Sequence, residues 1–213
     1  MRIKFDEQLA LLNHELIAMG ALCEEAIAIT ARSVMDNDRS LSARVRDLEY
    51  QIDQKEREIE TICLKLLLQQ QPVASDLRLI SAALKMITDM ERIGDQALDI
   101  AETATFMGPV DGADAPLLRE LARKVISMVT DSVDAFVRGD EALAHAVIVA
   151  DDTVDDLFLK MRGKLIQLIS SGENGSVCLD LMMVAKYFER IGDHSVNVAQ
   201  WVEYSLTGHY EEG

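Results

Sequence analysis

Two identical acidic pentapeptides, Glu-Arg-Ile-Gly-Asp, stand at residues 91–95 and 189–193. Each places two carboxylates four residues apart, and four residues advance an α-helix by one turn plus about 40°, so both side chains lie on one face. Carboxylate oxygens in this arrangement suit hard cations such as Mg²⁺, Mn²⁺ and Ca²⁺, or iron. The repeat therefore predicts the same helical cation-binding chemistry in both halves of the chain.

The oxygen-bearing side chains extend beyond the two pentapeptides. A matching acidic pair occurs one helix earlier in each half, and one more oxygen ligand follows one turn after each motif. Like charges one turn apart destabilise a helix by a few tenths of a kcal/mol, so four such pairs indicate a positive group above them. The predicted metal ligands are Glu49, Asp53, Glu91, Asp95, Asp99, Asp151, Asp155, Glu189, Asp193 and Asn197.

Readings without a metal stay open for these residues. Glu91 and Glu189 fall on core-facing stripes, where a carboxylate needs a compensating partner. Arg92 and Arg190 could neutralise the acidic side chains internally, and the pairs could also form a solvated acidic face. His194, beside the second motif, is either an additional ligand or a packing residue.

The elements that position these residues are predicted to be helices. Apolar residues recur at alternating spacings of three and four along six segments, and no segment alternates with the period of two that a strand needs. Residues 109–116, which hold Pro109, Gly112 and Pro116, are predicted to form the linker between the halves. The predicted helices cover about 6–36, 41 to the corner at 69–72, 73–101, 118–139, 143–170 and 177–206.

The expected fold is all-α. Short loops make neighbouring helices antiparallel, so each half should be an up-down-up three-helix bundle. We predict two tandem antiparallel three-helix bundles, at 1–109 and 110–213, which form a six-helix pseudo-twofold repeat. Gly94 and Gly192 each cost about 1 kcal/mol inside a helix relative to Ala, which indicates close helix approach beside the acidic residues, with a flexible kink as the weaker alternative.

Composition restricts the partners and the location. The formal net charge of −16 argues against nucleic acid or an anionic membrane as the main ligand, since both are polyanions. No N-terminal signal and no apolar run of membrane-spanning length is present, so we expect a cytoplasmic protein that meets membranes only through its partners. Cys23, Cys63 and Cys178 lack metal or disulfide spacing and are expected in the core.

Motifs of the common enzyme classes are absent from the sequence. No phosphate-binding P-loop, dinucleotide-binding turn, nucleophile elbow or His-Glu-x-x-His helix occurs. The Glu-x-x-His pattern of di-iron carboxylate bundles is missing as well. We therefore expect a protein that is not an enzyme, and keep a metal-storage or di-metal carboxylate enzyme bundle as the alternative.

The chain resembles the PhoU family of bacterial phosphate-signalling proteins. The resemblance rests on the two pentapeptides and on Pro-Val-Ala-Ser-Asp-Leu-Arg-Leu at residues 72–79, and it covers about residues 10–206. It implies a homodimeric negative regulator of phosphate uptake that acts with a phosphate ABC transporter ATPase and a phosphate-sensing histidine kinase. It also implies metal ions in both acidic sites, with Mg, Mn, Fe, Ca and Zn all open.

Overall fold

The computed structural model describes residues 2–69, 73–108 and 115–209, with side chains from residue 5 to residue 68 in the first of these segments. The prediction of an all-α fold is confirmed, because the described residues form six helices. These helices are α1 (Arg2–Asp36), α2 (Leu41–Gln69), α3 (Ala74–Phe106), α4 (Ala115–Arg138), α5 (Glu141–Ser170) and α6 (Gly175–Thr207).

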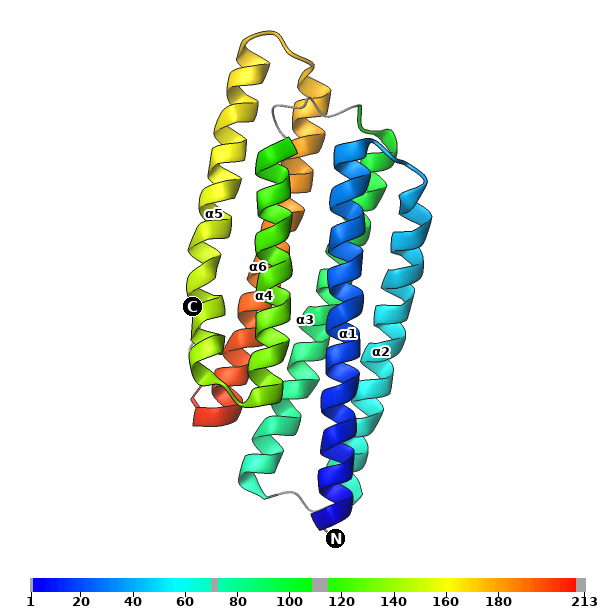
Figure 1. Cartoon of the computed structure of the whole chain (residues 1–213), viewed down its shortest axis with the longest axis vertical. Coiled ribbons are helices and arrows are strands. Elements are labelled where there is room, and N and C mark those ends of the chain that lie inside the picture. Colours follow the sequence, from blue (N-terminus) through cyan, green and yellow to red (C-terminus); the bar gives the residue numbers. More distant parts are fainter. Residues whose placement is uncertain (1, 70–72, 109–114, 210–213) are drawn as a thin grey trace.

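The helices form two three-helix groups that share one core (Figure 1). Helices α1, α2 and α3 pack against one another, and α4, α5 and α6 do the same. The halves meet where α3 packs against α6 and α1 packs against α4. Helices α2 and α5 are the outermost elements, since each contacts only the other two helices of its own half.

The residues at several helix ends explain where those helices begin or stop. The Asp140 carboxylate accepts a hydrogen bond from the Leu143 N–H at 3.0 Å and caps the start of α5. Gly208 has φ = 80° and ends α6 in the left-handed conformation that glycine adopts without strain. Pro116, predicted in the linker, instead lies in the first turn of α4. Proline is tolerated there because the N–H groups of the first turn have no acceptor within the helix.

Part of the predicted organisation lies outside the described residues. The corner at 70–72 and the linker at 109–114, with the boundary between residues 109 and 110, belong to this group. The bounds 1–109 and 110–213 therefore stay a prediction. None of the described helices combines the length and the apolar character needed to cross a membrane.

The core confirms the three predicted cysteines and corrects three other positions. Cys23, Cys63 and Cys178 are all buried, and burial raises the pKa of the Cys23 thiol to about 12. The apolar spacing of the third predicted helix begins with Val73 and Leu77 and predicts both in the core. They are 56% and 47% exposed, because they lie at the N-cap and in the first turn of α3. Met183 lies in an apolar run of the sixth predicted helix and is a predicted core residue, but it is 48% exposed on α6.

Lys55 interrupts the apolar stripe of α2 for a reason that the structure makes clear. Its ammonium group lies 2.5 Å from a Glu15 carboxylate oxygen on α1 and 2.7 Å from a Glu58 oxygen on α2. The four-carbon stem covers apolar surface while the charge reaches these carboxylates at the edge. The interruption therefore joins α1 to α2 by an ion pair.

Candidate functional site

Each half carries one row of predicted oxygen ligands on its second and third helices. The first acidic row is contributed by α2 and α3, and the second acidic row by α5 and α6. The first acidic row comprises Glu49, Asp53, Glu91, Asp95 and Asp99. The second acidic row comprises Asp151, Asp155, Glu189, Asp193 and Asn197.

In the first half, a glycine lets the two acidic helices approach closely. A Cβ at Gly94 would lie 3.0 Å from Cδ1 of Ile52 on α2, so close approach, rather than a kink, accounts for this residue. Burial raises the pKa of Glu49, and the negative charges of Asp53 and Asp95 raise it further. Because Asp95 belongs to α3, carboxylates from the two helices share one electrostatic environment.

Glu91 occupies the partly desolvated position that the core stripe predicts. Burial is the main cause that raises its pKa, and Asp95 and Glu56 add to the shift. Glu56, on α2, was not among the predicted ligands, although its own pKa is raised by burial and then by Asp53. The sequence marks Glu56 only as one of several acidic residues on α2, so its place beside the first acidic row depends on the packing of α2 on α3.

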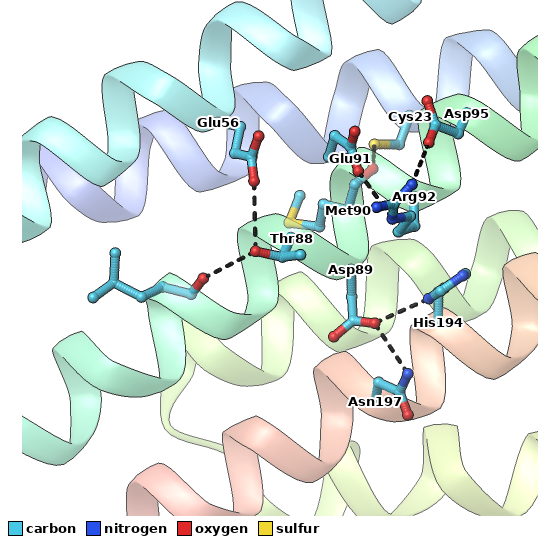
Figure 2. A network of polar contacts seen from close by, with 11 residues as sticks. Cys23, Glu56, Thr88, Asp89, Met90, Glu91, Arg92, Asp95, His194 and Asn197 are labelled. Atoms are coloured by element: carbon cyan, nitrogen blue, oxygen red, sulfur yellow. Dashed lines mark hydrogen bonds and ion pairs between the residues drawn. The ribbon is translucent and has the colours of Figure 1, made fainter.

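Arginine partly neutralises the first acidic row from within the chain. Arg92 places Nη1 2.9 Å from Oδ2 of Asp95 and Nε 3.5 Å from Oε2 of Glu91 (Figure 2). Arg57 on α2 lies 3.4 Å from Asp53. Both arginine side chains are more than half exposed, so these pairs are weak and exchange readily with solvent.

In the second half, Asp151 is the most perturbed carboxylate. A Cβ at Gly192 would lie 3.0 Å from Asp151 Oδ1, so the missing side chain makes room for the carboxylate between α5 and α6. Burial, followed by the charges of Asp193, Asp155 and Glu189, raises the pKa of Asp151 to about 6. The buried Oδ1 has no hydrogen-bond partner among the residues that the structure describes.

Glu189 and Asp193 are held near a lysine that the sequence reasoning missed. Lys186, one turn before Glu189 on α6, pairs with the Glu189 carboxylate, which is only 11% exposed. Burial raises the pKa of Asp193, and the Lys186 charge lowers it in opposition. The charge of Arg190 also lowers the pKa of Asp193, at longer range. The ion pair within the second acidic row is therefore made by Lys186, with Glu189.

Two residues that follow the second motif contact the first half. Asp89 on α3 accepts a hydrogen bond at 3.0 Å from the Asn197 side-chain N–H₂, and the same oxygen lies 2.9 Å from His194 Nδ1 (Figure 2). His194 is therefore a packing residue at the α3–α6 contact in this structure. Asp89 carries no repeat or stripe signal, because its role is set by the crossing of two helices about a hundred residues apart.

The chemistry of the donors fits a hard cation. The rows present oxygen ligands, and the unpartnered buried Asp151 Oδ1 is an acceptor that a cation would satisfy. If a cation binds, the first acidic row and the second acidic row would hold it and the cation would neutralise their repulsion. Among the residues that the structure describes, no three His, Cys, Asp or Glu side chains are grouped as a formed metal site. The ligand set stays a prediction.

Comparison with known proteins gives consistent results over nearly the whole chain. A curated relative from Pseudomonas aeruginosa, the phosphate-specific transport system accessory protein PhoU homolog, is 34% identical over 96% of this chain and 86% of its own length. The crystal structure of PhoU from that organism superposes with a TM-score of 0.87 at 34% identity, over 96% of this chain and 100% of that one.

A second crystal structure agrees on the fold alone. It is the phosphate transport system regulatory protein PhoU from Streptococcus pneumoniae, with a TM-score of 0.89 at 22% identity, over 98% of this chain and 99% of that one. The family model described as the PhoU domain matches twice, at residues 16–104 and 118–202, once in each three-helix group. With two matched repeats and a full-length relative at 34% identity, this chain belongs to the PhoU family.

Proposed function

We propose that this protein is a cytoplasmic negative regulator of high-affinity phosphate uptake. The observation that carries the proposal is the 34% identity, over 96% of the chain, to a relative named as an accessory protein of phosphate-specific transport. The family is not enzymatic, in agreement with the missing catalytic motifs. The protein would act as an adaptor between the phosphate transporter ATPase and the phosphate-sensing histidine kinase.

The acidic rows support a metal-binding role within this proposal. Several of their carboxylates have raised pKa values, with burial as the main cause and neighbouring acids as the second. A bound divalent cation would remove this repulsion and change the charge of the surface that a partner meets. We propose that cation loading adjusts docking through the two rows.

A pull-down from phosphate-replete cells tests the adaptor proposal. Tagged protein should recover the transporter ATPase and the sensor kinase, and deleting the gene should switch on the phosphate-starvation response in rich phosphate. Recovery of neither partner, together with an unchanged response in the deletion strain, would overturn the regulatory proposal. A variant with every predicted ligand of the second acidic row neutralised tests the role of the metal separately. If this variant recovers the same partners in the same amounts as the wild type, both in chelator and in Mn²⁺, a cation in that row has no part in the mechanism.

A further inference from the structure

The turn between α5 and α6 projects from one end of the molecule. Figure 1 shows this turn, at the top of the view, beyond the ends of the other four helices. Close to it, four large apolar side chains are exposed on the two helices. This apolar tip comprises Ile166 and Ile169 on α5 and Leu179 and Met183 on α6, which are 50%, 43%, 62% and 48% exposed. A single exposed apolar side chain is ordinary, but a group of four at a projecting end indicates a binding surface.

Basic residues lie behind the apolar tip. Lys160, Arg162 and Lys164 are the charged residues of α5 that follow Asp156. The first half of α4 runs beside this part of α5, because a short turn joins the two packed helices, and it adds three more basic residues. This basic band comprises Arg119, Arg123, Lys124, Lys160, Arg162 and Lys164. The acidic residues at 115–124 and 157–183 are Glu120, Glu173 and Asp180, so this end is positive although the chain has a net charge of −16.

Most of the basic band is not paired within the described part of the chain. Arg119, Arg123, Lys160 and Arg162 are exposed, and none of the four forms an ion pair with another described residue. Their charges are therefore open to a partner of opposite sign from outside.

We propose that this end of the second half binds the surface of an anionic lipid bilayer, with the apolar tip inserted among the lipid headgroups. Apolar side chains enter the boundary between headgroups and acyl chains, and nearby lysine and arginine residues bind the anionic headgroups. An acidic protein surface would match the basic band, but a projecting apolar tip needs a partner that deforms around it. A fluid bilayer accepts such a tip, so both features have a partner at once.

The spacing along α5 fits this arrangement. At 1.5 Å per residue, Arg162 and Lys164 lie about 8–11 Å from Ile169 along the helix axis. An interfacial helix is buried to a depth of roughly 5–10 Å. When the apolar tip is inserted to this depth, both cations reach the level of the lipid phosphates.

End-on binding also keeps the acidic rows away from the lipid. Asp155 of the second acidic row lies about 14 Å farther along α5 than Lys164, and the Debye length is about 8 Å at physiological ionic strength. Repulsion between the acidic rows and the bilayer is therefore largely screened. The net charge argues against a membrane that meets the whole surface, but not against one that meets this end alone.

The equivalent helix end in the first half lacks the basic residues. Leu64 and Leu68, near the end of α2, are 46% and 82% exposed. After Arg57, however, α2 contains one basic residue, Lys65, and two acidic ones. The first half therefore supplies control positions with the same apolar character and without the excess of positive charge.

Vesicle flotation with the purified full chain tests the proposal. At physiological ionic strength, the wild type should float with vesicles of equal parts phosphatidylserine and phosphatidylcholine, and not with vesicles of phosphatidylcholine alone. Binding should fall at least tenfold in about 1 M salt, where the Debye length shrinks to about 3 Å. The band variant, Lys160→Glu with Arg162→Glu, and the tip variant, Ile166→Ser with Leu179→Ser, should each bind at least tenfold more weakly than the wild type.

Matched controls separate this end from general effects of charge and apolar surface. Lys65→Glu with Arg138→Glu reverses two charges at other exposed positions, and Leu64→Ser with Leu68→Ser removes two other exposed apolar side chains. Both controls should bind the mixed vesicles like the wild type. Circular dichroism spectra of all variants should match, since every changed side chain is exposed.

Three results would overturn the proposal: a wild type that does not float with the mixed vesicles, a band or tip variant that floats like the wild type, or controls that bind as weakly as those variants. If the wild type does not bind lipid while both variants lose the transporter ATPase from a pull-down, this end is a protein interface instead. Because the flotation assay contains only this chain and lipid, its result is independent of the regulatory proposal.

Discussion

Among the described residues, Asp151 is the carboxylate whose ionisation its surroundings oppose most strongly. Its carboxylate is partly buried against α6, close to four other acids, and one of its oxygens has no hydrogen-bond partner among the described residues. The folded protein therefore holds this proton more tightly than the unfolded chain, in which the pKa is near 3.8. As pH rises from about 4 to above 6, ionisation of Asp151 costs stability in the absence of metal.

Asp151→Asn should therefore stabilise the metal-free protein at neutral pH. We expect a gain on the order of 1 kcal/mol at pH 7.5, after allowance for the solvent that still reaches the carboxylate, and no gain below about pH 4. Urea unfolding in chelator at the two pH values measures the difference. The exposed Asp47→Asn is the control. A loss of stability at pH 7.5 would mean that the charge has a partner.

Asp95 and Asp193 test the ligand assignment at the residue scale. Replacing both by Asn should abolish divalent cation binding, measured by calorimetric titration of Mn²⁺ into stripped protein, because each acidic row loses a central charge. The metal-free double variant should be as stable as the wild type to within about 1 kcal/mol, since the Arg92 pair that it breaks is exposed and weak.

The control for this pair is Asp6→Asn with Asp47→Asn, at two exposed positions. That variant should bind Mn²⁺ like the wild type. If the double variant at Asp95 and Asp193 retains full binding, the cation lies elsewhere. If it loses more than about 2 kcal/mol without metal, the two carboxylates stabilise the fold by internal pairing.

At the scale of elements, the contact between α3 and α6 joins the two halves by more than apolar packing. Asp89 contacts both His194 and Asn197 across that contact. Both residues follow the second motif, so the first half fixes one side chain of the second acidic row, Asn197, and its neighbour His194. The two halves therefore differ in their polar contacts. Asp89 lies two residues before the first motif, and the equivalent position before the second motif is Tyr187.

Asp89→Ala should weaken the joint between the halves. Without the Asp89 carboxylate, the partly buried side chains of His194 and Asn197 lose a shared hydrogen-bond acceptor, which lowers the free energy of unfolding by about 1–3 kcal/mol. Denaturant unfolding gives the free energy, and hydrogen exchange should locate faster opening in α3 and α6. Asp47→Ala on α2 should leave both measurements unchanged. An unchanged unfolding free energy for Asp89→Ala would show that water replaces the contact at no cost.

For the whole molecule, we predict that the apolar core keeps the protein folded without a metal. Buried side chains from both halves form one cluster, and the acidic rows lie at its edge. We expect chelation to lower the melting temperature by a few degrees through lost ligand linkage and to leave the helical circular dichroism spectrum intact. Loss of helical signal on adding chelator would instead make the metal structural. Readdition of Mg²⁺ or Mn²⁺ serves as the control for reversibility.

The sequence by itself determined the helices and their pairing into two related halves. Long stripes at three- and four-residue spacing specify helices because only that period keeps apolar side chains on one face. The repeated pentapeptide also identified the carboxylates, and Gly94 and Gly192 indicated the close approach of helices beside them. Local spacing contains this information, so no tertiary structure was needed to read it.

Tertiary structure alone decided which polar and charged side chains meet. Asp89 with Asn197, Lys55 with Glu15, and the neighbours that perturb Asp151 come from different helices, and their distances depend on how those helices cross. The exposure of Val73 and Met183 was decided in the same way, because the spacing of apolar residues along one helix does not record which part of it a neighbouring helix covers. A one-dimensional pattern fixes the face of each helix, whereas contacts between faces arise only when the helices pack.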